Sequence, residues 1–237
     1  MTTLGSILKT MVRVTIDPRR LDEGAIRRAA EAIAGGGLVV VPTDTLYAIA
    51  ANPFDECAVE RVFLAKGRPD DRALPLIAAD LTQVIEAIGP LTDAVHDLVT
   101  RYWPGPLTVL MTPPPALAHG VAAGTGRVGV RVPAHGVARA LCAACGHPLT
   151  ATSANLSGSA ASADATTAVQ GIESAIALTL DAGPTPGGPP STIVDVSSGR
   201  ATLVRSGAIP WKEIEAWVLD RQAGANARSS SGSSAAR

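Results

Sequence analysis

The sequence predicts a single α/β domain: a twisted sheet of mixed parallel and antiparallel strands flanked by helices. Short apolar runs bounded by Gly and Pro, typical of buried strands, alternate with segments of helical periodicity over most of the 237 residues. The last apolar runs follow one another without room for a helical crossover, so part of the sheet is expected to be antiparallel. Neither a repeat nor an internal linker divides the chain.

The first elements are recognised from their capping residues and their periodicity. A helix is expected over residues 22–34, because Asp22 can cap its first turn and apolar residues recur on one face. The continuously apolar run at 38–41 is typical of a strand buried on both faces. A second helix is expected to start after Asp55 and to end at Gly67.

The later elements follow from the same patterns. Further strands are expected at 107–111, 128–132, 149–151, 177–180, 192–196 and 201–204, with helices near Val84, Val95, Ala138 and Val169 and a final amphipathic helix over 210–219. Residues 1–13 are expected to form an N-terminal extension, residues 14–220 the domain, and residues 221–237, rich in Ser, Ala and Gly, a disordered tail.

The charge balance argues against broad binding to polyanions. The chain is 46% apolar and 17% charged, and its 20 basic residues face 21 acidic ones. Without the tail, which carries three arginines and no acid, the body has a net charge of −4. Bulk affinity for nucleic acid or an anionic membrane is therefore not expected. No apolar run approaches the ~20 residues that span a bilayer, and no signal peptide is recognised, so a cytoplasmic protein without a membrane partner is expected.

Cys142 and Cys145 form a C-x-x-C pair, with His135 and His147 nearby in the sequence. The pair falls in an Ala-rich helical stretch, where cysteine serves as a small hydrophobic residue. A structural zinc site would need further ligands at regular spacing. We therefore assign no metal ligands.

Polar and basic side chains gather at the ends of the predicted strands, where open α/β sheets bind ligands. The polar residues are Thr43, Asp44, Thr45, Ser153, Asn155, Ser157 and Ser191, and the basic residues are Lys66, Arg68, Arg72, Arg127, Arg131 and Arg205. Taken singly, each polar residue is equally compatible with a turn or a cap. The segment 183–190, rich in Gly and Pro, is either a lid or a plain connection.

Two of the basic residues are the most informative. Arg131 lies among apolar residues, so its buried charge needs a carboxylate or a phosphate partner, and a structural salt bridge is the alternative. Lys66 is one of only 3 lysines against 17 arginines, which suggests a role for a compact, flexible charge, although a surface lysine placed by chance is the alternative. The two commonest glycine-rich nucleotide loops are absent from the sequence. A nucleophile elbow and a plausible nucleophilic cysteine are also absent, which disfavours acyl-enzyme chemistry.

Seven motifs, taken in order, resemble those of the YrdC-like threonylcarbamoyl-AMP synthases. They are Pro-Thr-Asp-Thr-Leu-Tyr (42–47), Lys-Gly-Arg-Pro (66–69), Trp-Pro-Gly-Pro-Leu-Thr (103–108), Val-Gly-Val-Arg-Val-Pro-Ala-His (128–135), Ser-Ala-Asn-Leu-Ser-Gly (153–158), Ser-Thr-Ile-Val-Asp (191–195) and Arg-Ser-Gly-Ala-Ile (205–209). Each motif is weak alone, but their order and spacing over residues 14–210 are specific.

The resemblance implies a deep cavity lined with positive charge. It also implies the formation of threonylcarbamoyl-AMP and pyrophosphate from L-threonine, bicarbonate and ATP. Mg²⁺ would be bound by the phosphates of ATP, and no protein ligand is assigned to the metal. The product would supply tRNA threonylcarbamoyladenosine formation, which makes tRNA and other proteins of that pathway expected partners. Carried over by residue, the implied threonine contacts are Thr43, Thr45, Arg131 and Ser191, and the implied ATP contacts are Lys66, Arg68, Arg72, Ser153, Asn155 and Arg205. Lys66 and Arg68 would be catalytic.

The sequence departs from the family pattern at several positions. Ala48 and Ala50 replace glycines, Ile77 replaces a histidine of some longer members, and Arg127 replaces a threonine. The family motif expected at 160–163 is only partly present, so the nucleotide contact expected there is made by Ser162 or is lost. Three other functions stay open: an RNA-binding or regulatory paralogue without synthase activity, the carbamoyl-phosphate domain of hydrogenase maturation, and a nucleotide-binding module without turnover. The intact motifs at 66–68 and 153–155 favour the synthase.

Overall fold

The computed structural model describes residues 11–67, 73–198 and 200–232, and its strands form two mixed sheets. The five-stranded sheet has the order β1 (Val12–Thr15), β9 (Ile176–Asp181), β2 (Leu38–Pro42), β3 (Tyr47–Ala50) and β8 (Thr152–Ser153). The six-stranded sheet has the order β11 (Thr202–Arg205), β10 (Thr192–Asp195), β5 (Leu107–Met111), β6 (Val128–Arg131), β4 (Leu76–Ile77) and β7 (Leu149–Thr150). The mixed α/β class is confirmed, but the strands belong to two sheets where one was expected.

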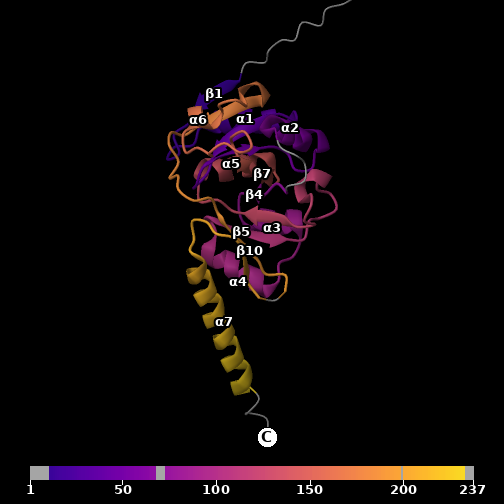
Figure 1. Cartoon of the computed structure of the whole chain (residues 1–237), viewed down its shortest axis with the longest axis vertical. Coiled ribbons are helices and arrows are strands. Elements are labelled where there is room, and N and C mark those ends of the chain that lie inside the picture. The colour runs from indigo at the N-terminus through magenta and orange to yellow at the C-terminus, as the bar shows by residue number, and fades with distance from the viewer. Residues whose placement is uncertain (1–10, 68–72, 199, 233–237) are drawn as a thin grey trace, which may run out of the picture.

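Helices cover these sheets. They are α1 (Glu23–Ala34), α2 (Glu56–Lys66), α3 (Leu81–Ile88), α4 (Asp93–Tyr102), α5 (Gly136–Cys145), α6 (Ala165–Ala168) and α7 (Trp211–Gly232), with 3-10 turns at His119–Ala122 and Glu173–Ala175. Along the long axis of the molecule, β1 and α1 lie near one end, β5 and β10 lie further along, and α7 projects from the other end (Figure 1).

The segment 149–153 explains how the two sheets are joined. Leu149 and Thr150 pair with β4 in the six-stranded sheet, and Thr152 and Ser153 pair with β3 in the five-stranded sheet. Between them, the amide of Ala151 donates to the carbonyl of Pro75 at 2.8 Å. Strands of two residues carry no periodic signal, so the sequence could not reveal that the chain changes sheets here.

The strand β2 lies at the centre of the core, as the sequence predicts. All five of its residues are buried. Alternate residues point to opposite faces of a strand. Accordingly, Val39 and Val41 pack with α1 and α5 in one apolar cluster, while Leu38 and Val40 pack with α2 and the six-stranded sheet in the other. The five-stranded sheet therefore separates two apolar clusters, one on each face.

Side-chain caps fix the helices that flank this core. The carboxylate of Asp22 accepts hydrogen bonds from the amides of Gly24 and Ala25 at 2.8 and 3.1 Å, and Asp55 caps α2 in the same way. At the other end of α2, Gly67 adopts φ = 57°, a left-handed conformation that glycine takes without steric strain. Both predicted helix starts and the predicted end of α2 are confirmed.

The first strand and the last helix extend beyond the elements expected at the two ends of the chain. β1 starts at Val12 and pairs in parallel with β9, so the strand begins within the expected N-terminal extension of residues 1–13. At the other end, α7 continues to Gly232, whereas helix was expected only to residue 219, with disorder from residue 221. Alanine and arginine are good helix formers, which allows the helix to continue through this part of the tail. The helix expected near Val169 is the single turn α6.

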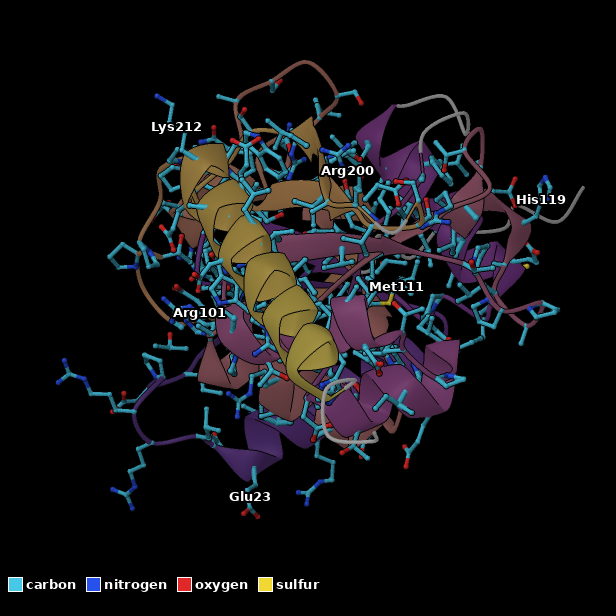
Figure 2. The ribbon with its side chains drawn as sticks, turned by 90° about the horizontal axis from the view of Figure 1, so that it is seen from below. Glu23, Arg101, Met111, His119, Arg200 and Lys212 are labelled. Atoms are coloured by element: carbon cyan, nitrogen blue, oxygen red, sulfur yellow. The ribbon has the colours of Figure 1, made fainter. Side chains whose placement is uncertain are left out.

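Seen from below, α7 lies in front of the body with Lys212 near its first turn and Arg101, from α4, beside it (Figure 2). Within the described residues, none of the helices combines the length and the apolar character needed to cross a membrane.

Candidate functional site

The turn between β2 and β3 carries the first polar group of the site. Thr43 Oγ1 donates to the carbonyl of Leu46 at 2.7 Å and accepts from the amides of Thr45 and Leu46, both at 3.2 Å. Thr43 Oγ1 and Thr45 Oγ1 are 3.0 Å apart. Because Thr43 gives its proton to Leu46, the hydroxyl of Thr45 is the donor in that contact. Both threonines are buried, so the turn presents fixed hydroxyl groups.

Arg131, at the end of β6, reaches this turn from the other sheet. Its guanidinium pairs with the carboxylate of Asp44, and its Nη1 lies 3.4 Å from Thr45 Oγ1. Its Nε donates to the carbonyl of Gly105 at 3.0 Å. Asp44 is thus the carboxylate partner that the sequence required. Burial lowers the pKa of Arg131 below its ordinary value, and the charge of Asp44 opposes that effect.

The backbone at Gly105 approaches its neighbours too closely for a side chain. A Cβ at this position would lie 2.4 Å from the carbonyl oxygen of Tyr102. Glycine therefore allows the chain to turn between α4 and β5 and to present its carbonyl to Arg131. This close approach explains why a glycine occurs within the motif at 103–108.

Ser191 and Arg205 form the next part of the site. Arg205 donates through Nη2 to the Ser191 carbonyl at 2.7 Å and to its Oγ at 3.1 Å, and Ser191 Oγ lies 2.8 Å from Thr108 Oγ1. The segment after Arg205 folds back onto Ser191, with a Gly at 207 where a Cβ would fall 2.3 Å from the carbonyl of Pro190. Glycine is needed for that approach.

Two guanidinium groups of the site interact electrostatically. The pKa of Arg205 is lowered first by burial and then by the positive charge of Arg131. The two positive charges repel each other, and an anion bound near both would offset that repulsion. Arg131, Arg205 and the hydroxyls of Thr45 and Ser191 therefore form a site suited to a carboxylate or a phosphate.

Lys66, the last residue of α2, belongs to a second polar group. It is 3% exposed, so the alternative of a surface lysine placed by chance is wrong. Its Nζ donates to the carbonyls of Ser153 and Asn155 at 2.6 and 2.9 Å and lies 3.3 Å from Asn155 Oδ1. The amide of Ser157 donates back to the Lys66 carbonyl at 2.9 Å. The motifs at 66–69 and 153–158, distant in the sequence, thus meet in the structure.

The strand β3 connects the two polar groups. It follows the turn of Thr43 and Thr45, and its Ala48 is paired with Ser153 on β8. The amide of Ala154 donates to the carbonyl of Tyr47 at 2.9 Å. The structure therefore brings together eight of the ten candidate residues, in two groups that share one strand. The other two, Arg68 and Arg72, lie outside the described residues.

The Gly/Pro-rich segment 183–190 is bonded to the same turn. Thr185 Oγ1 and the amide of Gly187 both donate to the carbonyl of Thr45 at 2.9 Å. Tyr47 donates to the carbonyl of Gly183 at 2.6 Å, and burial raises the pKa of its hydroxyl to about 12. In this structure the segment is a fixed support for the Thr45 turn.

The residues that depart from the family pattern have structural roles in the fold. Ala48, Ala50 and Ile77 belong to the apolar cluster beneath α1 and α5. Arg127 donates to Asp195 at 3.1 Å and to the carbonyl of Leu110 at 3.0 Å. The hydroxyl of Ser162 is bonded to the backbone of Asp164 in a local turn.

His135 is a site residue whose role the sequence pattern did not assign. It stands at the end of the motif at 128–135, at the N-cap position of α5 but without a side-chain capping hydrogen bond, and near enough to Asp44 for their charges to interact. Its Nδ1 is buried and, among the described residues, has no hydrogen-bond partner. Burial lowers the pKa of this imidazole below its ordinary value despite the nearby carboxylate. The ring is therefore neutral at neutral pH.

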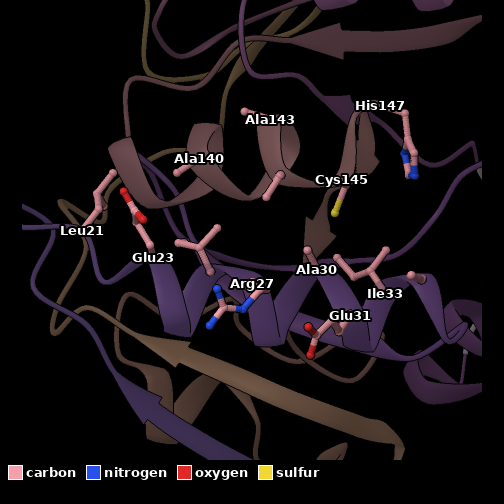
Figure 3. Close-up of a pocket in the computed structure, with 13 residues that line it drawn as sticks. Leu21, Glu23, Arg27, Ala30, Glu31, Ile33, Ala140, Ala143, Cys145 and His147 are labelled. Atoms are coloured by element: carbon pink, nitrogen blue, oxygen red, sulfur yellow. The ribbon is translucent and has the colours of Figure 1, made fainter.

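The cysteines and a surface cavity lie elsewhere. Cys142 is buried among apolar side chains, which confirms its interpretation as a small hydrophobic residue, and burial raises the pKa of Cys145 to about 11. A cavity of about 650 Å³ lies between α1 and α5, with Cys145 and His147 on its wall (Figure 3). Alanines form much of its lining, and none of the candidate site residues borders it.

Comparison with known proteins points to one family. The family model Sua5_yciO_yrdC, described as telomere recombination, matches residues 31–207. A threonylcarbamoyl-AMP synthase of Pyrococcus abyssi is 36% identical over 196 residues, which are 83% of this chain and 58% of the relative. A putative threonylcarbamoyl-AMP synthase of Mycobacterium leprae is 34% identical over 193 residues, which are 81% of this chain and 87% of the relative.

A solved structure agrees with these relatives. The crystal structure of P. abyssi Sua5 complexed with L-threonine is similar with a TM-score of 0.80 and 35% identity, covering 86% of this chain and 59% of that one. The chain thus spans about three fifths of the length of the P. abyssi protein.

Proposed function

Because the chain belongs to the Sua5/YciO/YrdC family, we propose that it is a threonylcarbamoyl-AMP synthase, a nucleotidyltransferase acting on L-threonine, bicarbonate and ATP. The observation that carries this proposal is the pair of guanidinium groups, the buried Arg131 and the more exposed Arg205, whose charges interact beside fixed hydroxyls. The site has the charge and the hydrogen-bonding groups needed to bring an amino acid carboxylate next to a nucleotide phosphate.

The threonine subsite is proposed around the turn between β2 and β3. Arg131 and Ser191 face the amino acid carboxylate, since a guanidinium and a hydroxyl are natural donors to it. Thr43 and Thr45 supply hydroxyls for the polar side chain of the substrate. The hydrogen bonds from Arg131 to Thr45 and from Thr45 to Thr43 support this assignment, because they fix the orientation of each group before binding.

The nucleotide subsite is proposed around Lys66 and Arg205, with Ser153 and Asn155 beside them. Lys66 is held by the backbone of residues 153 and 155, so an ATP phosphate bound there would meet a positioned ammonium group. Arg68 and Arg72 are proposed as further phosphate contacts on their place in the sequence alone. ATP is expected to bind as its Mg²⁺ complex, with the metal held by the phosphates.

The chemistry requires charge stabilisation more than a nucleophilic side chain. The amine of threonine and bicarbonate form a carbamate and water. A carbamate oxygen then attacks the α-phosphorus of ATP, and the bond to pyrophosphate breaks with its electron pair on the leaving group. An anion approaches an anion in this step, so Lys66, Arg68 and Arg205 would lower the barrier by neutralising the developing charge.

The product is a mixed anhydride that a further protein must use. We propose that it supplies the threonylcarbamoyl group for tRNA threonylcarbamoyladenosine in the cytoplasm, together with the other proteins of that modification. With a net charge of −1, the chain is not expected to bind tRNA strongly by itself. The proposal does not require such binding, because another protein would transfer the group to tRNA.

The decisive experiment measures pyrophosphate after incubation of the protein with ATP, Mg²⁺ and bicarbonate, with and without L-threonine. Release that depends on both threonine and bicarbonate is the expected result. Absent release, or release that does not respond to threonine, contradicts the synthase assignment. Salt-sensitive RNA binding without pyrophosphate release would instead favour the RNA-binding paralogue.

A further inference from the structure

Asp44 uses only one of its two carboxylate oxygens within the described structure. Oδ1 pairs with the guanidinium of Arg131. Oδ2 is buried, and no donor among residues 11–67, 73–198 and 200–232 forms a hydrogen bond with it. A buried carboxylate oxygen without a donor is unfavourable, so natural sites usually satisfy such an atom with a protein group, water or ligand. Oδ2 is therefore an acceptor that the described protein groups leave without a donor.

The charges around Asp44 indicate what kind of donor this is. Arg131 already shares its charge with Oδ1, and His135, a second described titratable group whose charge interacts with Asp44, is neutral at neutral pH because burial lowers its pKa. Lys66 is bonded to the backbone of residues 153 and 155. The oxygen is consequently suited to a cationic donor brought by the ligand.

The arrangement is complementary to an α-amino acid. A zwitterion carries its carboxylate and its ammonium group on adjacent atoms of one small molecule. Arg131 and the free oxygen of Asp44 present the two opposite charges side by side, and Thr45, next to Asp44 in the chain, presents a hydroxyl 3.4 Å from the same guanidinium. A nucleotide phosphate has no group that would satisfy Oδ2.

We propose that Oδ2 of Asp44 accepts a hydrogen bond from the ammonium group of L-threonine, and that Asp44 thereby selects an α-amino acid over other hydroxy acids. This inference rests on the proposed function, because it takes the turn of residues 43–45 as part of the threonine subsite. Asp44 has a second role in holding Arg131, and the two roles can be separated by choice of ligand.

The experiment compares the binding of L-threonine with that of (R)-3-hydroxybutanoate, the same molecule without its ammonium group, by calorimetric titration of wild-type protein and Asp44→Asn. Asparagine keeps an oxygen for Arg131 but loses the charge that attracts an ammonium group. Wild-type protein is expected to prefer threonine by about tenfold or more, as a charge-assisted hydrogen bond predicts. Asp44→Asn is expected to lose most of that preference while binding 3-hydroxybutanoate within about twofold of wild type.

A role limited to holding Arg131 gives a different result. In that case Asp44→Asn weakens both ligands equally, the preference survives, and the proposal is wrong. Should the variant fail to fold, wild-type protein alone decides the question, because equal affinities for the two ligands overturn the proposal. If wild-type protein neither binds threonine nor releases pyrophosphate, the proposed function itself has failed.

Asp195→Asn is the matched control. Asp195 also pairs with an arginine, Arg127, at 3.1 Å, and lies in the six-stranded sheet that carries Arg131. The same chemical change at this position is expected to leave both affinities unchanged.

Discussion

At the scale of single residues, buried charge distinguishes the site from the rest of the molecule. Lys66 and Arg131 are both almost fully buried, and each is satisfied by protein groups: backbone carbonyls for Lys66, and a carboxylate and a carbonyl for Arg131. Arginine in an apolar strand can be recognised from sequence as a charge that needs a partner. The carboxylate that pairs with it cannot be recognised in this way, because Asp44 lies in the turn between β2 and β3 of one sheet and Arg131 ends β6 of the other.

The ammonium group of Lys66 is expected to be essential for adenylate formation. Lys66→Ala removes a positioned positive charge and should raise the barrier by about 2 kcal/mol or more, a loss of roughly thirtyfold in turnover. Pyrophosphate release at saturating ATP and threonine measures the effect. Lys212→Ala, at an exposed position in the first turn of α7, is the control and should retain full turnover. Near-normal turnover of Lys66→Ala would exclude the catalytic role.

His135 should make the fold sensitive to mild acid. Its pKa in the folded protein lies below the ordinary value, so the unfolded chain binds a proton first as the pH falls. The stability that depends on the neutral ring is complete above the unfolded pKa of about 6.5 and is lost progressively below it. The start of α5 adds to this effect, since a helix N-terminus disfavours a positive charge.

Urea denaturation at about pH 7 and about pH 5.5 tests this expectation. Wild-type protein should lose more free energy of unfolding between these two pH values than His135→Gln, which cannot titrate. An identical loss in both proteins would assign the acid sensitivity to other groups.

At the scale of elements, α2 is the helix on which the site depends most directly, because it ends at Lys66. Asp55→Ala removes the side-chain cap that accepts from the amides of Cys57 and Ala58 at 2.9 and 3.2 Å. A lost N-cap costs about 1 kcal/mol of folding free energy. Chemical denaturation should show this loss, and Glu60→Ala, an exposed residue of the same helix, should change stability by less than about 0.5 kcal/mol. Equal effects of the two changes would contradict the capping role.

The sequence predicted the capped and periodic elements well and the short ones poorly. α1, α2 and β2 are defined by local signals, namely the carboxylate caps, Gly67 and an unbroken apolar run. The strands β4 and β8, with two residues each, and β3 (Tyr47–Ala50) were not predicted, whereas β7 was expected as a strand at 149–151. Tertiary pairing defines these strands, and a pattern in the sequence cannot report it.

In the candidate site too, the sequence predicted which residues take part but not how they are arranged. The motifs identified eight described residues that the fold brings into two connected groups. The orientation of each group came only from the structure: Lys66 points at carbonyls, and Arg205 at Ser191. His135 carried one signal, its place at the end of a motif, which does not reveal that its ring is buried near Asp44.

At the scale of the whole molecule, α7 is attached to the body by its first turns. Ile214 is fully buried in the larger apolar cluster, and Trp217 packs edge-on against Tyr102 of α4 with ring centroids 6.1 Å apart. The ion pair of Arg221 with Asp97 is exposed and adds little. Apolar contacts near the start of α7 therefore determine its position.

Shortening Ile214 should destabilise the whole domain. Ile214→Ala leaves a cavity in the core and should cost about 2 to 5 kcal/mol in thermal or urea denaturation. Leu219→Ala, on the same helix but 57% exposed, should change the free energy of unfolding by less than about 0.5 kcal/mol. If Ile214→Ala is as mild as Leu219→Ala, α7 does not contribute to the core.

The segment 149–153 passes from one sheet to the other and supplies the carbonyl that holds Lys66. The edge strands β7 and β8 are separated by one residue, so the opening of either sheet disturbs the edge of the other. The molecule should consequently unfold in a single transition, and amide hydrogens of β4 and β3 should exchange with solvent at closely similar rates in the native state. The amino acid and nucleotide halves of the site would then be lost together, which protects the chain from a half-folded state that binds one substrate and wastes it.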